Sequence, residues 1–398
     1  MSGRALFRQP RRKRRGAALT LVFAGALTAG AVTGSLPGTA EARRMDAKAE
    51  AAQGGQDAGK RAVPRPEDVR RAAAEAMAKG ESPTEAAEQA VSRSGDRWAA
   101  VYSEDEYAEF RDALDGEYTG VGLWARRERD GHVTVSRVRS GSPAADAGIH
   151  RGDRLRSVDG RGVDGRPVTE VVSLLRGDAE DASAGTPVTV GIQRGTASWS
   201  RTLHRARLST DPVTVARQAD GVVVVRVSAF TKGAAGAVRD AVAAAPADSG
   251  IVLDLRGNSG GLVTEAVSAA SCFLDGGLVA TYDVDGAQRA LHAASGGDTA
   301  RPLVVLVDGG TMSAAELLTG ALQDRGRAVV IGSRTFGKGS VQMPTELPDG
   351  SVAELTVGHY RTPSGHAVDG RGITPDLDAG PGALERARKV LTGLGDPR

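Results

Sequence analysis

The stretch LVVLVDGGTMSAAELLTGALQD, residues 303–324, decides the fold. Its first five residues are all Leu or Val, which is typical of a buried strand. The turn residues Asp308, Gly309 and Gly310 follow, and apolar residues then recur at helical spacing from Ser313 onwards. A strand, a tight turn and a helix in this order indicate a layered α/β (α+β) core in which helices pack on a sheet.

The same alternation of strand and helix continues on both sides of this stretch. It predicts a layered core from about residue 209 to 380, followed by a C-terminal helix and tail over residues 381–398. The expected strands are 222–227, 250–255, 328–331 and 352–357, and the expected helices are 232–245, 262–274 and 382–391.

The half of the chain before residue 209 has a different character. From Pro66 the apolar spacing is helical, a second helix begins at 81–85, and a third begins near Ser103, where Glu106 closes a capping box. We therefore expect a small helical region over 65–116. Residues 117–208 are short β-rich runs separated by Gly-containing turns, which indicates an inserted β-rich domain in a multi-domain chain.

The first 42 residues are typical of an export signal. A basic run at 11–15 precedes the small-residue apolar stretch 16–32, and Ala40-Glu41-Ala42 has the form of a cleavage site. The alternative is a retained anchor helix. Either way we expect an extracytoplasmic protein, secreted or held at the cell surface, with residues 43–64 as a flexible tether.

Charge and cysteine content exclude several classes of protein. Cleavage after Ala42 removes seven basic residues and one acid, which turns the net charge from +2 to −4 and argues against nucleic-acid binding. The single cysteine, Cys272, excludes an internal disulfide and lies in an apolar setting that favours a buried, inert thiol. No Cys/His cluster has metal-ligand spacing, so we expect neither a metal nor a cofactor.

Ser313 and Lys338 are the candidate catalytic pair. Ser313 stands at a strand end and a helix N-terminus, where local N–H groups favour developing negative charge and the N–H of Ala314 can serve as an oxyanion donor. A serine needs a base, and a buried lysine can be one when its pKa falls towards neutrality. The alternatives are a plain helix cap for Ser313 and an ordinary exposed loop lysine for Lys338.

The neighbours of Lys338 favour the catalytic interpretation. Flanking glycines let the backbone approach closely, and Gln342 can orient the amine through a neutral hydrogen bond. A phosphate loop is a poor second interpretation, because Lys338 is followed by Gly339 and not by Ser or Thr. A third element, the turn 257–261, joins a strand to a helix, so Gly260 or Gly261 can supply a second oxyanion donor, although it could also be a simple connector.

Residues 118–208 resemble a PDZ domain. The resemblance rests on the loop Gly120-Val121-Gly122-Leu123, the run Ser-Pro-Ala-Ala-x-Ala-Gly-Ile at 142–149, and the pairs at 152–153 and 158–160. A turn of this kind exposes N–H groups that can hold a terminal carboxylate, while the adjacent sheet edge takes a peptide as an added strand. The expected tail-binding residues are Gly120, Val121, Gly122 and Leu123.

Taken together, these motifs make the chain similar to the carboxyl-terminal processing, or tail-specific, proteases. The matches are Asp-Leu-Arg-x-Asn-x-Gly-Gly at 254–261, Ser-Ala-x-Glu at 313–316, the run 320–324 followed by Phe-Gly-Lys-Gly-Ser-Val-Gln at 336–342, and the tail motifs at 360–365 and 372–376. The resemblance spans about 66–378. Ser259 departs from the proline that many relatives have, and Thr311-Met312 departs from a small lead-in to the nucleophile.

The resemblance implies a serine endopeptidase. Ser313 would be the nucleophile, Lys338 the general base and Gln342 the positioner of the lysine, and the PDZ domain would capture unstructured C-terminal tails of extracytoplasmic proteins. Of the six histidines, only His366 lies in a family-like motif, and we expect it on a surface loop. The alternative is a catalytically inactive scaffold or chaperone that binds protein C-termini. The sequence leaves open the oligomeric state and the need for an activator or adaptor.

Overall fold

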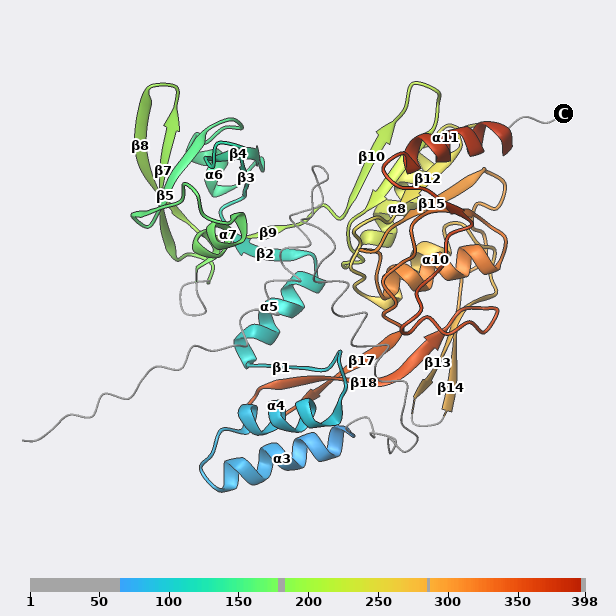
Figure 1. The fold of residues 1–398 in the computed structure, drawn as a ribbon, viewed down its shortest axis with the longest axis horizontal. Helices are drawn as coiled ribbons and strands as arrows, with labels where there is room; N and C mark the ends of the chain where they lie inside the picture. Colours follow the sequence, from blue (N-terminus) through green and yellow to red (C-terminus); the bar gives the residue numbers. More distant parts are fainter. Residues whose placement is uncertain (1–64, 178–182, 285–286, 395–398) are drawn as a thin grey trace, which may run out of the picture.

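The computed structural model describes residues 65–177, 183–284 and 287–394, and Figure 1 shows their arrangement. The expected signal peptide and tether lie outside the described residues. Among the helices within these ranges, none has both the length and the apolar character that crossing a membrane requires.

A six-stranded sheet forms the centre of the C-terminal half. Five of its strands are parallel and β10 joins the edge antiparallel to β11. In spatial order they are β10 (Val213–Arg217), β11 (Val223–Val227), β12 (Ile251–Asp254), β15 (Leu303–Val307), β16 (Val329–Gly332) and β19 (Leu377–Asp378). β15 has the bounds expected from its run of Leu and Val, and all five residues are buried. The layered α/β class is thereby confirmed.

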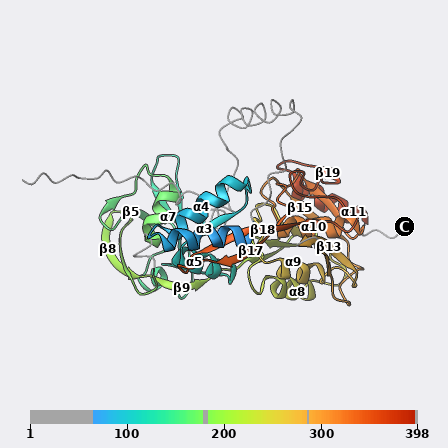
Figure 2. The same cartoon turned by 90° about the horizontal axis from the view of Figure 1, so that it is seen from below.

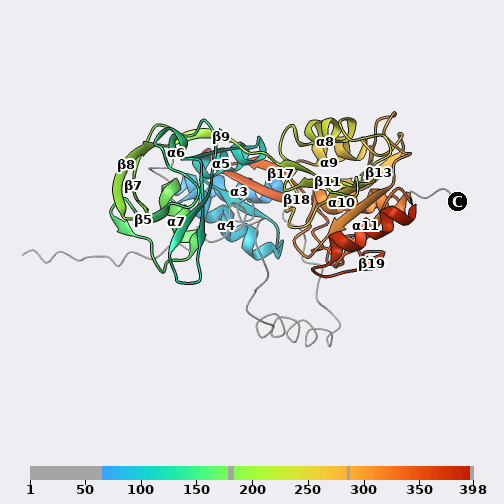
Figure 3. The same cartoon turned by 90° about the horizontal axis from the view of Figure 1, so that it is seen from above.

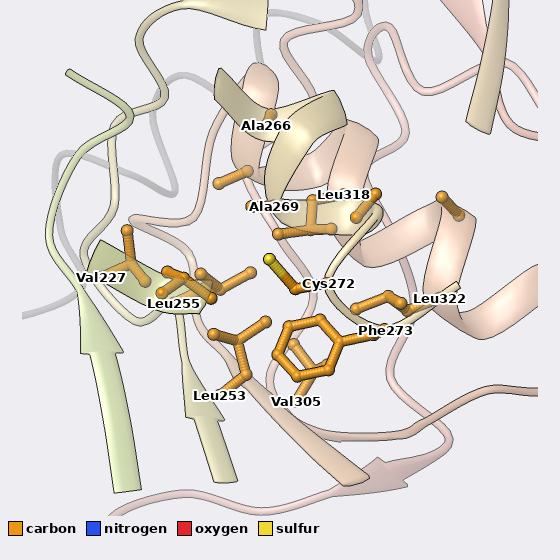
Figure 4. Packing of buried hydrophobic residues seen from close by; sticks show 14 of the residues in the cluster. Val227, Leu253, Leu255, Ala266, Ala269, Cys272, Phe273, Val305, Leu318 and Leu322 are labelled. Atoms are coloured by element: carbon orange, nitrogen blue, oxygen red, sulfur yellow. The ribbon is translucent and has the colours of Figure 1, made fainter. Parts of the chain in front are cut away.

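Helices cover both faces of this sheet. α8 (Ala234–Ala243), α9 (Val263–Ala270) and α10 (Ala314–Asp324) share one apolar cluster, while α11 (Ala383–Leu394) packs through Ala387 and Leu391 on the other face. Figure 3 shows α8 and α9 on the opposite side of the sheet from α11. Cys272 lies within the first cluster beside Phe273 (Figure 4), so the expectation of a buried cysteine is confirmed, and burial raises the pKa of its thiol, which disfavours the reactive thiolate.

A second sheet joins distant parts of the sequence. It contains β1 (Ala100–Tyr102), β18 (Val352–Arg361), β13 (Leu278–Val284) and β14 (Ala287–His292) in that order, and β17 (Ser340–Glu346) pairs with β18. Helices α3 (Pro66–Ala78) and α4 (Pro83–Ser94) pack on the β17–β18 hairpin, where Val69 and Val91 share a core with Leu347 and Leu355. Figures 1 and 2 show these N-terminal helices against β17 and β18. The N-terminal helical region is therefore built onto the C-terminal part of the chain.

The inserted β-rich region follows α5 (Glu104–Leu114), which starts at Ser103 with the expected Ser103–Glu106 capping box. A two-stranded sheet of β2 (Glu117–Gly120) and β9 (Ala206–Ser209) leads into and out of it. Its own sheet has the order β3 (Leu123–Arg127), β4 (Val133–Val138), β5 (Arg154–Val158), β7 (Pro187–Arg194) and β8 (Ala197–His204), with β6 (Arg161–Gly162) paired to β5. It also holds α6 (Pro143–Asp146) and α7 (Val168–Arg176), and α7 lies beside the edge strand β3.

Candidate active site

The candidate site forms where β12 and β15, adjacent parallel strands, end at the same edge of the sheet. The turn after each strand contacts the other. Met312 N donates to Asn258 O at 2.8 Å, and Gly257 N donates to the Asp308 carboxylate at 2.9 Å. Thr311, one of the departures from the family pattern, is fully buried and donates from its hydroxyl to Leu255 O at 2.9 Å. The two loops are thus one bonded unit.

Ser313 occupies a strained backbone conformation in this unit. Its φ of 51° and ψ of −118° differ from the extended conformation that an ordinary helix N-cap residue adopts. Such a conformation costs of the order of 1–3 kcal/mol and persists only where the surroundings enforce it, most often at functional sites. The half-buried Ser313 therefore has a geometry that the plain cap interpretation does not require.

Lys338 is buried, with 9% of its surface exposed. Gly339 allows this, because a Cβ there would lie 2.4 Å from Asp369 N, so the chain can pass only as glycine. Burial lowers the pKa of the Lys338 amine, while the negative charges of Glu354 and Asp96 act in the opposite direction. The exposed-lysine alternative for Lys338 is therefore wrong.

The fully buried carboxylate of Glu316 joins the backbones of the two candidate residues. Its Oε2 accepts a hydrogen bond from Ser313 N and one from Lys338 N, each at 2.9 Å, and its Oε1 accepts from Gly337 N at 2.7 Å. Burial raises the pKa of Glu316, and the hydrogen bonds it accepts oppose that rise. Because one oxygen serves both N–H groups, the backbones of Ser313 and Lys338 lie side by side.

Tyr360 makes a second bridge between the same two residues. Its hydroxyl donates to Ser313 O at 2.8 Å and lies 3.1 Å from Lys338 O. Burial raises the pKa of Tyr360, so the phenol keeps its proton and remains a donor. Neither Glu316 nor Tyr360 is predicted as a site residue from the sequence, and the one signal for them is their place in the motifs at 313–316 and 360–365.

Two of the three expected oxyanion donors, Ala314 and Gly260, lie next to Ser313. Ala314 is the first residue of α10, and Gly260 is packed against the serine, since a Cβ on Gly260 would lie 3.0 Å from Ser313 Cβ. The Gly260 N–H donates to Asn258 Oδ1 at 2.8 Å, whereas Gly261 is next to it in the same turn. The Gly260 N–H is therefore already bonded, and Gly261 packs against the backbone of Phe230, where a Cβ on Gly261 would lie 2.5 Å from Phe230 O.

Gln342 lies on β17, four residues beyond Lys338. Its Nε2 donates to the carbonyl oxygen of Trp98, which precedes β1. The Lys338 Nζ lies 5.3 Å from the centroid of the Trp98 ring. The expected residue Gln342 is therefore bonded to Trp98, whose ring also contacts Lys338. The structure thus adds Trp98, which the sequence does not predict as a site residue, to Ser313, Lys338 and the turn 257–261.

The expected tail-binding loop, residues 120–123, lies in the β-rich region and is distant in the sequence from the candidate active-site residues. Val121 and Gly122 are buried, and their carbonyls accept hydrogen bonds from Ala144 N and Arg139 N. Gly122 has a φ of 76°, and a Cβ there would lie 2.2 Å from Ser142 Cβ, so this position requires glycine. Leu123 starts the edge strand β3, beside α7, as a groove for an added peptide strand requires.

His366 is exposed, as expected for a surface loop. Its Nδ1 lies 3.0 Å from Ser364 Oγ and 3.8 Å from Asp324 Oδ1, so a serine, a histidine and an aspartate meet there. Both contacts involve the same ring nitrogen, whereas a catalytic triad needs one nitrogen for each partner. Within the described ranges, no group of three or more His, Cys, Asp or Glu side chains is arranged to hold a metal ion.

Comparison with known proteins places these features in a family. Residues 221–379 match the model of peptidase family S41, and residues 134–194 match that of a PDZ domain. The chain is 38% identical over 315 residues to carboxyl-terminal-processing peptidase 3, chloroplastic, from Arabidopsis thaliana. The matched region covers 74% of this chain and 60% of that relative. It is 34% identical over 292 residues to a probable CtpA-like serine protease from Staphylococcus aureus (strain COL), covering 71% and 57%.

The match thus spans less than two thirds of the length of these relatives. Among solved structures, a photosystem II D1 C-terminal processing protease is 31% identical, covering 78% of this chain and 86% of that one, with a TM-score of 0.49. The chain belongs to peptidase family S41 and carries a PDZ domain, and it is similar to carboxyl-terminal processing proteases.

Proposed function

We propose that this protein is an exported serine endopeptidase that captures C-terminal tails of extracytoplasmic proteins, envelope proteins among them, and cleaves them with a Ser313–Lys338 dyad. The observation that carries the proposal is the pair of bridges from Glu316 and Tyr360, which hold both backbones together. The strained conformation of Ser313 and the burial of Lys338 support the same roles.

The proposed reaction proceeds in two halves. Neutral Lys338 takes the hydroxyl proton as Ser313 Oγ attacks the scissile carbonyl carbon, and the oxyanion forms beside Ala314 N and a glycine N–H of the turn 257–261. Lys338 then returns the proton to the leaving amine as the C–N bond breaks, which leaves an acyl-enzyme on Ser313. A water attacks that ester while Lys338 takes its proton, and Lys338 returns this proton to Ser313 Oγ as the ester C–O bond breaks and the second product leaves.

The PDZ domain would deliver the substrate. An unstructured tail would add as a strand to the β3 edge beside α7, with its terminal carboxylate at the 120–123 loop. The substrates are therefore proteins or peptides with accessible, apolar C-terminal ends. No nucleic acid, metal or cofactor takes part in the proposed reaction.

Cleavage of an apolar-tailed peptide by matched variants tests the proposal. We expect Ser313→Ala and Lys338→Ala to abolish cleavage while circular dichroism and thermal unfolding show a retained fold. Lys232→Ala is the matched control, since this lysine is exposed and pairs with Asp115. Wild-type turnover in either site variant would refute the dyad. A wild-type protein that binds the peptide without cleaving it would favour the scaffold alternative.

A further inference from the structure

A short segment from the N-terminal region reaches the candidate active site. Residues Asp96–Ala99, which we call the Asp96–Ala99 strap, connect α4 to β1. The Asp96 carboxylate accepts hydrogen bonds from Trp98 N at 3.0 Å and from Ala99 N at 3.2 Å, which folds the strap into a turn. The same carboxylate accepts from Thr356 N and Thr356 Oγ1, each at 3.1 Å, which fixes the turn to β18.

Trp98 in the strap contacts Lys338 through its indole ring and Gln342 through its carbonyl oxygen. The Trp98 carbonyl accepts from the amide nitrogen of Gln342, and the indole ring lies under Lys338, with Nζ 5.3 Å from the ring centroid. Phe336 packs on the same ring at 5.7 Å between centroids. With its Nε2 held by the carbonyl, the Gln342 amide is left with Oε1, an acceptor suited to an amine.

The indole ring is not placed there by a hydrogen bond of its own. Its Nε1 is buried and has no hydrogen-bond partner within the described residues, an arrangement that costs about 1–3 kcal/mol. The ring has two opposite effects on Lys338. It displaces water, which favours the neutral amine, and its π face attracts the ammonium, which favours the charged form.

We propose that Trp98 is a positioning residue for Lys338, because its ring covers the amine and excludes water while its carbonyl fixes Gln342. The inference rests on the proposed role of Lys338 as general base. The charged groups that act on the amine are Glu354 on β18 and Asp96 in the strap. The guanidinium carbon of Arg97 lies over the Trp98 ring, 4.7 Å from its centroid, and the Glu316 carboxylate accepts a hydrogen bond from Lys338 N. Exclusion of water is the larger effect on the amine, since burial is the leading cause of its lowered pKa.

The test compares Trp98→Ala with the conservative Trp98→Phe. The Ala variant admits water to Lys338, so we expect the pKa of the amine to rise by at least about one unit towards its usual value. The acid limb of the kcat/KM profile should move to higher pH by the same amount, and kcat should fall more than KM rises. Trp98→Phe keeps an aromatic cover and should restore the wild-type profile.

A direct readout separates this inference from the catalytic proposal. Trace acetylation with acetic anhydride across a pH series, followed by peptide mass spectrometry, gives the pKa of Lys338 without any cleavage assay. The exposed Lys232 and Lys389 serve as internal references, and Trp199→Ala, which removes a half-buried tryptophan of β8, is the control variant. An unchanged or lowered pKa of Lys338 in Trp98→Ala overturns the positioning role. If Lys338→Ala still cleaves peptide, the dyad fails, whatever the acetylation shows.

Discussion

At the residue scale, Ser313 and Lys338 depend on two other side chains for their proximity. Twenty-five positions separate them in the sequence, and their backbones meet because Glu316 accepts from both N–H groups and Tyr360 contacts both carbonyls. The proposed nucleophile and base are therefore each held by the backbone, which leaves their side chains for chemistry. These bridges hold the two backbones close together before a substrate arrives, as the proposed dyad requires.

Replacing Glu316 by glutamine should damage this arrangement. An amide has one acceptor oxygen, and its NH2 group would face either the N–H donors of Ser313 and Lys338 or the N–H donor of Gly337. We expect kcat to fall by about 100-fold, since a small misplacement of reacting groups has effects of that size. The free energy of unfolding should fall by about 3 kcal/mol, because buried donors lose their partner. Steady-state kinetics and urea unfolding measure the two losses, and normal kcat with intact stability would contradict the bridge.

The pH dependence of cleavage should follow Lys338. Its lowered pKa means that the amine loses its proton at a pH below the usual 10.5, and only the neutral amine can act as a base. Activity should therefore rise with pH through the pKa of Lys338. In Glu354→Gln a negative charge that favours the ammonium is gone, so the acid limb of kcat/KM should move to lower pH. A limb that stays in place or moves to higher pH in this variant would contradict the assignment.

At the scale of elements, the candidate active site lies at the ends of β12 and β15, and the expected tail-binding groove lies at the edge strand β3 beside α7. β15 could be predicted with its observed bounds because its residues form an unbroken apolar run between turn signals. The β13–β14 hairpin was not predicted, because most of β14 is exposed and its residues do not alternate between apolar and polar. The strap was also missed, since the partners of Asp96 and Trp98 lie more than 240 positions away and leave no local pattern.

The helix α7 offers a test of the tail-binding groove. Arg205, with 3% of its surface exposed, donates to Leu175 O at 3.0 Å and to Pro187 O at 2.9 Å, and so ties the end of α7 to β7. Arg205→Met leaves these carbonyls without a donor. We expect a loss of about 3 kcal/mol in unfolding free energy and weaker binding of an apolar-tailed peptide, measured by denaturation and fluorescence anisotropy. The neighbouring exposed Arg201→Met should change neither, and equal behaviour of the two variants would refute the role of Arg205.

At the scale of the whole molecule, the N-terminal helices and the C-terminal hairpin form one structural unit. Val69 and Val91 bury against Leu347 and Leu355, and the strap that follows α4 carries Trp98 to the lysine. The division into a helical region, a PDZ domain and a layered core could be proposed from composition and motifs. This shared core could not, because apolar periodicity shows that a helix face is buried without showing what covers it.

Undocking α4 should therefore reduce catalysis at a distance. Ala87 is fully buried in the shared core, and Ala87→Asp would place an unpaired carboxylate there at a cost of several kcal/mol. We expect a lower Tm together with a lower kcat, because β17 carries Gln342. Gln89→Asp changes an exposed position on the same helix and should leave both values unchanged. A full kcat in a destabilised Ala87→Asp protein would show that the helices do not support the site.

Covalent labelling of Ser313 shows whether this serine is an activated nucleophile that depends on Lys338. The full chain would be incubated with a fluorophosphonate probe, with and without an apolar-tailed peptide that can occupy the PDZ domain, and the adduct located by mass spectrometry. We expect one adduct on the wild-type protein, at Ser313, and its loss in Lys338→Ala, because the serine then lacks its base. Absence of an adduct at Ser313 under both conditions, or labelling of Lys338→Ala at the wild-type rate, would contradict the Ser313–Lys338 dyad.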